Sequence, residues 1–315
     1  FETLPEVDEE TPSYVEFITG PGGVIDTWLR RGAAGFRLDV ADELPDEFIE
    51  KVRAAVKRVS PEKFLLGEVW EDATTKFGFN KRRTYLLGKG LDSVMNYPFK
   101  NAVLDFVKGK PAEQAMTEIL TICEHYPAPA MDTALNFLST HDTERALTVI
   151  ADEPANGRGR AWQSGRCVTG DAYEEGLLRL RMAYAIIYTL PGVPCLYYGD
   201  EIAMQGYRDP FNRAFFRWDA HEQRLRPVLA QLAQLRHTCE AFRTGQLRVL
   251  RAEDGILHYQ RVGKVETAEI IVNRTEHIIV ETLASGKSTE VNPMGFTIVV
   301  EEVGHNPNHS YYDYV

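Results

Sequence analysis

Residues 33–59, AAGFRLDVADELPDEFIEKVRAAVKRV, join a short apolar run to an amphipathic helix. The run Ala33–Val40 predicts a buried strand that ends on charged side chains. Leu44–Val59 has apolar residues three and four positions apart, and Pro45 followed by acidic residues is typical of a helix N-terminus. The stretch therefore predicts one strand-helix unit with polar groups at the carboxyl end of its strand.

The same unit recurs through the first 200 residues. Further apolar runs predict strands at Phe64–Trp70, Ser93–Phe99, Asn136–His141 and Pro194–Gly199, and helical periodicity follows at Phe99–Val107, Ala112–His125, Glu174–Leu190 and Arg224–Arg243. Strands that alternate with helices pair in parallel, so a (β/α)₈ TIM barrel and a doubly wound sheet both fit. The barrel is favoured because polar residues follow several separate strands and no G-x-G-x-x-G follows any of them.

Five units are too few to close an eight-stranded barrel, which usually takes about 250 residues. We expect the front strands to lie ahead of Phe1, so that residues 1–243 form the C-terminal part of the barrel. After 244 the pattern changes to short β-branched runs at Leu247–Leu250, Ile256–Val262, Ala268–Val272, Ile278–Glu281 and Phe296–Val300. These runs predict a small antiparallel β-sandwich over 244–303, followed by a tail over 304–315.

Charge and composition restrict the partners of this 315-residue chain. Its formal net charge of −11 argues against nucleic acid, because binding a polyanion needs a basic surface. No apolar run approaches the roughly 20 residues of a membrane-spanning helix, so no membrane partner is expected. The four cysteines lack paired or metal-ligand spacing, which favours a reducing cytoplasmic location over secretion.

Two carboxylates follow neighbouring predicted strands. Arg37 and Asp39 share one face of their strand, and an arginine that keeps Asp39 ionised suits a nucleophile. A buried ion pair with a structural role is the alternative. Glu68 ends the next strand beside Trp70, and a glutamate desolvated by an aromatic ring suits a general acid. A surface glutamate beside a packed tryptophan is equally compatible.

A third carboxylate, Asp142, ends a later strand next to His141. This histidine has the chemistry to bind a sugar hydroxyl or to orient the carboxylate, although a lone His-Asp pair is more often structural. Three carboxylates at strand ends match the needs of glycosyl transfer, because retaining enzymes hold a nucleophile and an acid/base roughly 5–5.5 Å apart. A third carboxylate can bind sugar hydroxyls more strongly in the transition state.

Three short segments resemble signatures of the α-amylase family of glycoside hydrolases, in the same order and spacing. They are GFRLDV at 35–40, GEVW at 67–70 and FLSTHD at 137–142. The resemblance implies a (β/α)₈ barrel followed by a β-sandwich, with Asp39 as nucleophile, Glu68 as acid/base and Asp142 as transition-state stabiliser. Arg37 and His141 would support them.

One family signature, Asp-x-x-x-Asn-His, is absent from the chain. In the family it supplies a subsite histidine and, in many members, a calcium ligand. We therefore expect no cofactor or metal ligands within this chain, with any calcium of the full-length enzyme held by residues outside it. The chain alone is expected to be inactive.

Finer features resemble the neopullulanase and cyclomaltodextrinase branch. MNY at 95–97 matches that branch, ADE at 41–43 is similar to its Ala-Asn-Glu, and LPEVD at 4–8 matches part of its Met-Pro-Lys-Leu-Asn segment. The resemblance implies hydrolysis of α-1,4 and, as an open alternative, α-1,6 bonds in maltooligosaccharides, cyclodextrins or pullulan. It also implies a homodimer in the full-length form. The alternatives are a transglycosylase with the same site and a non-catalytic amylase-like binding or assembly protein.

Further side chains are candidate sugar contacts. Trp70, Tyr97 and Tyr198 have rings suited to stacking on glucose, with core packing as the alternative for each. Arg213 and Trp218 lie in the NRAFFRW segment, where the family has a loop on the substrate side.

Overall fold

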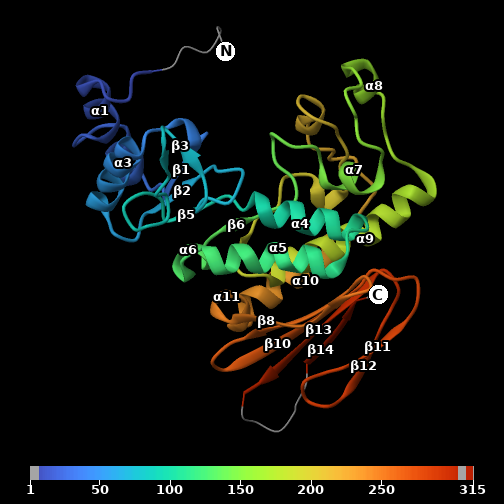
Figure 1. Cartoon of the computed structure of the whole chain (residues 1–315). Coiled ribbons are helices and arrows are strands. Elements are labelled where there is room, and N and C mark those ends of the chain that lie inside the picture. Colours follow the sequence, from blue (N-terminus) through green and yellow to red (C-terminus); the bar gives the residue numbers. More distant parts are fainter. Residues whose placement is uncertain (1–6, 304–309, 315) are drawn as a thin grey trace. The chain divides into compact units, whose positions relative to one another are not determined.

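The computed structural model describes residues 7–303 and 310–314 (Figure 1). The chain divides into two compact units. The first unit comprises residues 1–98 and 122–135, and the second comprises residues 99–121 and 136–315. Of the LPEVD segment, residues 4–6 lie outside the described part of the chain.

The first unit contains a parallel sheet of order β1-β2-β5. Strand β1 (Gly35–Leu38) pairs with β2 (Phe64–Gly67), which pairs with β5 (Ser93–Val94). The helices of this unit are α1 (Pro12–Thr19), α2 (Val24–Arg30), the 3-10 turn η1 (Ala41–Glu43), α3 (Asp46–Val59) and α6 (Ala128–Asp132). The connection from β2 to β5 holds a small hairpin of β3 (Phe77–Gly78) and β4 (Lys81–Arg82).

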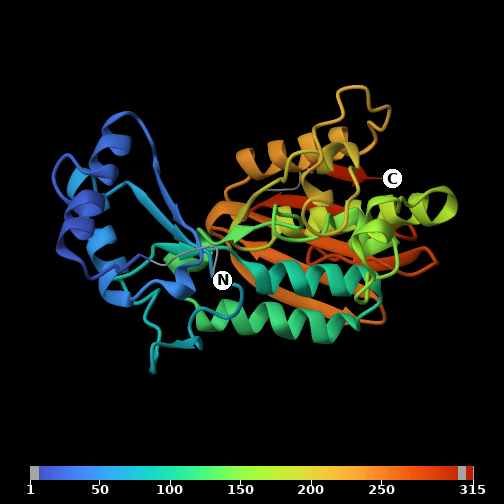
Figure 2. The same cartoon turned by 90° about the horizontal axis from the view of Figure 1, so that it is seen from above.

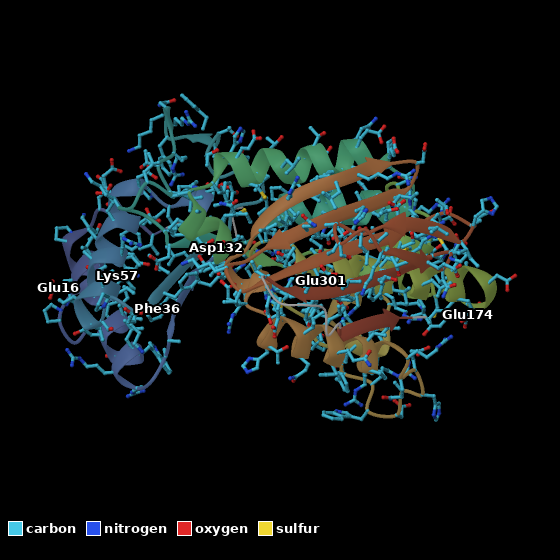
Figure 3. All side chains as sticks on the ribbon, turned by 90° about the horizontal axis from the view of Figure 1, so that it is seen from below. Glu16, Phe36, Lys57, Asp132, Glu174 and Glu301 are labelled. Atoms are coloured by element: carbon cyan, nitrogen blue, oxygen red, sulfur yellow. The ribbon has the colours of Figure 1, made fainter. Side chains whose placement is uncertain are left out.

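Helix α3 shows why the sequence folds this way. Its apolar residues Phe48, Ile49, Val52 and Val56 are buried along one face, at the spacing that places side chains on the same side of a helix. Acidic residues fill its first turn and basic residues its last, which complements the helix dipole. Figure 3 labels Lys57 on α3 and Phe36 on β1 among the packed side chains of this unit.

The second unit contains a five-stranded antiparallel sheet of order β14-β13-β10-β9-β8. Its strands are β8 (Gln246–Glu253), β9 (Ile256–Val262), β10 (Glu266–Asn273), β13 (Gly295–Glu302) and β14 (Ser310–Tyr314). A two-stranded sheet, β11 (Ile279–Thr282) with β12 (Ser288–Val291), packs on it through Ile279, Leu283 and Val291 against Ile271 and Val299. The antiparallel sandwich-like arrangement that the sequence predicts is present.

Helix α9 (Gly170–Thr189) of the second unit is hydrogen-bonded to this sheet. The helices of this unit include α7 (Ala146–Ala151), α8 (Arg160–Ser164), α9, α10 (Leu225–Thr238) and α11 (Ala241–Thr244), with the 3-10 turns η2 (Asp200–Ile202) and η3 (Phe211–Arg213). The Tyr259 hydroxyl lies 2.6 Å from Thr189 Oγ1, and Arg261 Nη1 donates to the Thr189 carbonyl at 2.7 Å. Strand β9 is therefore fastened to the C-terminal end of α9.

Four more elements complete the description, of which the first three contain residues assigned to both units and the last belongs to the second unit. These are α4 (Tyr97–Lys108), α5 (Ala112–His125), β6 (Leu135–Asn136) and β7 (Val193–Pro194). Over residues 99–108 and 112–121, α4 and α5 run side by side in both views (Figures 1 and 2). In the second unit the Cys195 N–H donates to the Asn136 carbonyl at 2.7 Å.

The structure corrects several sequence predictions. The predicted tail 304–315 contains strand β14, which pairs with β13 in antiparallel register; tyrosine, which occurs three times in SYYDY, is enriched in strands. The predicted helix Arg224–Arg243 is two helices, because the Glu240 N–H bonds to Glu266 Oε2 at 2.9 Å instead of continuing α10. The described residues show parallel pairing but no closed barrel.

Across residues 7–303 and 310–314, none of the helices combines the length and the apolar character that crossing a bilayer demands.

Candidate active site

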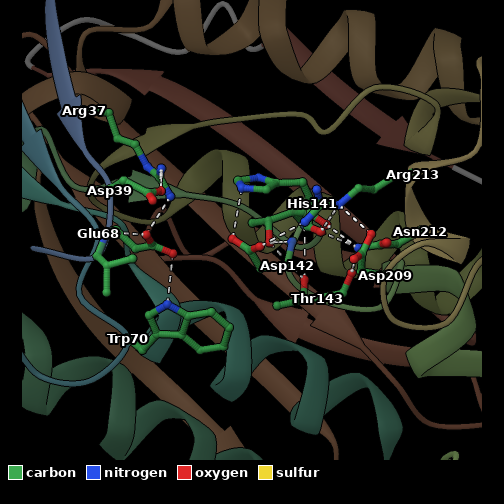
Figure 4. A network of polar contacts seen from close by, with 12 residues as sticks. Arg37, Asp39, Glu68, Trp70, His141, Asp142, Thr143, Asp209, Asn212 and Arg213 are labelled. Atoms are coloured by element: carbon green, nitrogen blue, oxygen red, sulfur yellow. Dashed lines mark hydrogen bonds and ion pairs between the residues drawn. The ribbon is translucent and has the colours of Figure 1, made fainter. Parts of the chain in front are cut away.

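Asp39 and Glu68 follow two neighbouring parallel strands, β1 and β2, so the carboxyl ends of these strands bring them to one edge of the sheet. The Asp39 side chain is 74% exposed, whereas that of Glu68 is only 4% exposed. Arg37 lies between them: its Nη1 pairs with Asp39 Oδ1 and its Nη2 is 2.9 Å from Glu68 Oε2 (Figure 4). One guanidinium thus contacts an exposed carboxylate and a buried one.

Both carboxylate oxygens of Glu68 have donors. The Val40 N–H donates to Oε2 at 2.8 Å, and Trp70 Nε1 donates to Oε1 at 3.0 Å. A buried carboxylate needs such partners, because its desolvation is costly without them. The donors also fix the orientation of the group, as a residue that transfers a proton at a defined position requires.

The backbone between these carboxylates is strained. Val40 has a φ of 42°, in the left-handed region that a β-branched residue rarely adopts. The next residue, Ala41, is fully buried and donates its N–H to the Glu68 carbonyl at 3.1 Å. Two successive N–H groups therefore bond to Glu68, one to its side chain and one to its main chain. Strained backbone of this kind concentrates at functional sites.

Of the predicted aromatic contacts in the first unit, Trp70 and Tyr97 differ in exposure. Their rings stack at 4.4 Å between centroids with an interplanar angle of 13°. Trp70 is 44% exposed, whereas Tyr97 is 2% exposed. Trp70 therefore has surface available for a sugar ring, and the structure favours the packing alternative for Tyr97, which supports Trp70.

Asp142 lies in a second polar cluster, in the second unit. His141 Nε2 is 3.0 Å from Asp142 Oδ2, and Arg213 Nη2 is 3.4 Å from Oδ1 (Figure 4). Arg213 Nε also donates to the His141 carbonyl at 2.9 Å and pairs with Asp209 Oδ1 at 3.0 Å. His141, Asp142 and Arg213, selected separately from the sequence, are thus in contact.

Asn212, which the sequence analysis did not identify, supports this cluster through hydrogen bonds to its backbone. It is fully buried, and its Nδ2 lies 3.3 Å from the Thr140 carbonyl and 2.8 Å from those of His141 and Thr143. These three bonds fix the turn that carries Asp142. A lone asparagine in a loop gives no sequence signal; only its position beside Arg213 hinted at this role.

A buried arginine, Arg145, connects the Asp142 segment to two later segments. Its Nη1 donates to the Tyr198 carbonyl at 2.6 Å and to Asp200 Oδ1 at 3.0 Å, and its Nε donates to the Asn212 carbonyl at 3.1 Å. Its guanidinium lies 4.8 Å from the Tyr198 ring centroid. One face of the Tyr198 ring therefore packs on Arg145. Tyr198 keeps partial exposure, and its hydroxyl donates to the Ala214 carbonyl at 2.8 Å.

Asp200, the partner of Arg145, is completely enclosed. Burial raises the pKa of Asp200 above its usual value, although hydrogen bonds from Tyr184 and Arg145 oppose this shift. The Tyr184 hydroxyl donates to Asp200 Oδ2 at 2.6 Å. The buried Arg145–Asp200 ion pair thus has a structural role in supporting the Asp142 cluster.

The predicted residues fall into two groups. Arg37, Asp39, Glu68 and Trp70 come together in the first unit, and His141, Asp142 and Arg213 come together in the second. Convergence of all three carboxylates on one sugar stays a prediction. In the described part of the chain, no group of three or more His, Cys, Asp or Glu residues is placed to hold a metal ion.

Comparisons with known proteins identify the family. Residues 1–244 match the family described as "Alpha amylase, catalytic domain". A cyclomaltodextrinase of Geobacillus thermopakistaniensis (strain MAS1) is 31% identical over 279 residues, which cover 86% of this chain and 42% of the relative. Neopullulanase 2 of Thermoactinomyces vulgaris is 30% identical over 295 residues, which cover 91% of this chain and 44% of the relative.

A solved structure, the native debranching enzyme of Nostoc punctiforme, superimposes with a TM-score of 0.77 at 26% identity, covering 94% of this chain and 63% of that one. The chain spans less than half the length of the two relatives described above. Their names confirm the resemblance to the neopullulanase and cyclomaltodextrinase branch. The chain belongs to the alpha-amylase family of glycoside hydrolases.

Proposed function

We propose that the protein containing this chain is a retaining glycoside hydrolase of α-glucans, with Asp39 as nucleophile, Glu68 as acid/base and Asp142 as transition-state stabiliser. The observation that carries the proposal is the Asp39–Arg37–Glu68 arrangement. An exposed carboxylate and a buried, fully bonded one lie at adjacent strand ends and share one guanidinium. Retaining hydrolysis needs two such carboxylates with different environments.

The reaction follows double displacement. An Asp39 oxygen attacks the anomeric carbon while the Glu68 carboxyl gives its proton to the glycosidic oxygen, and the leaving sugar departs. Glu68, now a carboxylate, takes a proton from water, and that water oxygen bonds to the anomeric carbon and releases Asp39. Asp142 binds sugar hydroxyls as the ring flattens, held by His141 and Arg213.

The proposed substrates are maltooligosaccharides, cyclodextrins or pullulan, with cleavage of α-1,4 and also α-1,6 bonds. Relatives named cyclomaltodextrinase and neopullulanase support this choice. The partly exposed ring of Trp70, next to Glu68, supports it too, because an aromatic face suits the apolar face of glucose. Arg213 and Tyr198 are proposed as further sugar contacts.

We further propose that preceding strands complete an eight-stranded barrel. In the described residues β1 pairs on one side only, and its residues are incompletely buried. For the whole protein we propose a cytoplasmic homodimer that needs no cofactor, with any calcium bound outside this chain.

The test is hydrolysis by the full-length protein and its Asp39→Asn variant, with Asp254→Asn as a matched control. Asp254 is an exposed residue of the β8–β9 turn, remote in sequence from the proposed site. Substrates are β-cyclodextrin, maltoheptaose and pullulan, and NMR follows the first anomer released. We expect the α-anomer from wild type and Asp254→Asn, and a loss of about 10⁴-fold or more in kcat for Asp39→Asn, since nucleophile removal costs losses of this order.

Unchanged sugar release by Asp39→Asn would remove the proposal. Release of the β-anomer would overturn the retaining mechanism. Sugar chains that lengthen when maltose is added would identify a transglycosylase with the same residues.

A further inference from the structure

Arg83, in the connection between β2 and β5, is a buried cation that the proposed chemistry does not use. Its side chain is fully buried, and its Nε donates to Asp46 Oδ1 at 2.8 Å. Its Nη1 donates to the Asp42 carbonyl at 2.9 Å and its Nη2 to the Leu44 carbonyl at 2.5 Å. One planar guanidinium therefore binds three positions of the five-residue segment 42–46.

The guanidinium is itself held in place. Phe79 and Tyr85 lie with their ring centroids 5.1 Å and 4.4 Å from its central carbon. Such cation-π contacts favour a fixed orientation of the plane. The Tyr85 hydroxyl also donates to Asp42 Oδ1 at 2.8 Å, and Lys76 Nζ lies 2.9 Å from Asp42 Oδ2. Residues of the β2–β5 connection thus hold Asp42 twice: Arg83 bonds to its main-chain carbonyl, and Tyr85 and Lys76 bind its side chain.

The segment fixed by Arg83 begins three residues after Asp39. Val40, between them, has a left-handed backbone, which is unfavourable for a β-branched residue and persists only where neighbours fix it. Asp39, on one side of Val40, is largely exposed and makes its ion pair with Arg37. On the other side, the fixed turn η1 starts at Ala41. Val40 is therefore held by the bond from its N–H to Glu68 and, on its other side, by segment 41–46, in which the Glu43 N–H donates to the Val40 carbonyl at 3.0 Å.

We propose that Arg83 is a positioning residue for the Asp39–Glu68 pair. By fixing residues 42–46, it holds Val40 in the left-handed conformation whose N–H orients Glu68 Oε2. The proposal rests on the proposed glycosidase function. It assigns a role in the reaction to the β2–β5 connection, through backbone geometry rather than through contact with sugar.

The test compares Arg83→Met and Arg83→Lys with the neighbouring control Arg82→Met in the full-length protein. Arg82 is exposed, and its Nε donates to the Thr74 carbonyl at 2.6 Å. Methionine keeps the length of the side chain but donates no hydrogen bond, so three acceptors lose their partner. Lysine retains a cation for Asp46 but cannot reproduce the planar fork. It serves as the folded variant if Arg83→Met does not fold.

We expect kcat on maltoheptaose to fall about 10²-fold in Arg83→Met, because a misplacement near 1 Å has this effect. KM should stay within about 3-fold, since no sugar contact is removed. Arg83→Lys should lie between Arg83→Met and wild type, and Arg82→Met should equal wild type. A folded Arg83→Met with wild-type kcat, or an equal loss in Arg82→Met, overturns the proposal.

A second readout does not depend on activity. Hydrogen exchange at the Val40 amide should be faster by about 10-fold or more in Arg83→Met, since the Val40 N–H is no longer held toward Glu68 Oε2. The Leu65 amide, which bonds to Asp92 Oδ2 at 2.8 Å, should exchange as in wild type. Unchanged exchange at Val40 contradicts the role of Arg83. If wild type hydrolyses no α-glucan, the proposed function fails, and exchange at Val40 still decides whether Arg83 fixes this backbone.

Discussion

Replacing Arg145 with methionine tests how the Asp142 cluster is supported. The substitution removes the cation beside Asp200, the donor to the Asn212 and Tyr198 carbonyls, and the contact with the Tyr198 ring. Both Arg145 and Asp200 are buried, so water does not replace the lost partner. Methionine fills much of the same volume, which limits the cavity that remains.

The size of the effect follows from the burial of Asp200. Removing one partner of a buried ion pair typically costs about 3–5 kcal/mol of the free energy of unfolding, because the other charge stays buried. The Tyr184 hydroxyl, 2.6 Å from Asp200 Oδ2, still donates. We therefore expect a loss near the lower bound, about 3 kcal/mol. In the double variant, Asp200→Asn replaces the unpaired buried carboxylate with a neutral amide. The free energy of unfolding should then be about 1–3 kcal/mol higher than the sum of the two single losses predicts.

The loss should depend on pH. Burial raises the pKa of Asp200, and without Arg145 less opposes this effect. A carboxyl whose folded-state pKa lies above its unfolded value is stabilised by its proton, so the stability is present at low pH and is lost as pH rises through the folded pKa. The Arg145→Met deficit should therefore be smaller at pH 5 than at pH 8.

Urea unfolding followed by tryptophan fluorescence at both pH values measures these differences. Arg226→Met, at an exposed position of α10, is the matched control and should change stability little. A deficit below about 1 kcal/mol, the range of an exposed pair, would refute the assigned burial of the ion pair. A deficit equal at pH 5 and pH 8 would refute the reasoning about Asp200.

Two further predictions concern single positions in the second unit. Gly199 has a φ of 87°, and an added Cβ would collide with Met204 Sδ, so Gly199→Ala should lose about 1–3 kcal/mol of stability. Gly159→Ala, where an added Cβ would meet open space, should not lose stability, and equal melting temperatures for the two variants would contradict this prediction. Although burial raises the pKa of Glu269, hydrogen bonds from His258, Gln260 and the Ala284 N–H lower it overall. The resulting stability is present above the unfolded pKa and is lost as pH falls below about 4. In Glu269→Gln the free energy of unfolding should therefore depend less on pH in the acid range, and a pH profile identical to that of wild type would contradict this prediction.

The sequence predicts elements best where periodicity and terminal signals agree. Helix α5 and strand β9 have the predicted bounds, Ala112–His125 and Ile256–Val262. The predicted strand Ser93–Phe99 is wrong beyond Val94, because Tyr97 and Pro98 begin α4, and a proline is well suited to a first helical turn. Strand β14 was missed because an edge strand of aromatic and polar residues carries no apolar alternation.

For the candidate site, the sequence identifies groups that carry charge at strand ends. Arg37, Asp39 and Glu68 are predictable because strand alternation and strand order bring them together. Asn212 and Arg83 are not, since their roles depend on carbonyl groups contributed by distant segments. Supporting residues of this kind are recognised only once the backbone is known.

The most direct test of the central claim is to trap the covalent intermediate on the full-length protein. A 5-fluoro-α-glucosyl fluoride donor forms the glycosyl-enzyme readily but slows its hydrolysis, so that digestion and mass spectrometry locate the sugar. We predict one added glycosyl group on the peptide that carries Asp39, with Glu68 and Asp142 unlabelled. A stable adduct on either of those residues instead, in an enzyme that turns over α-glucans, would contradict the assignment of Asp39 as the nucleophile.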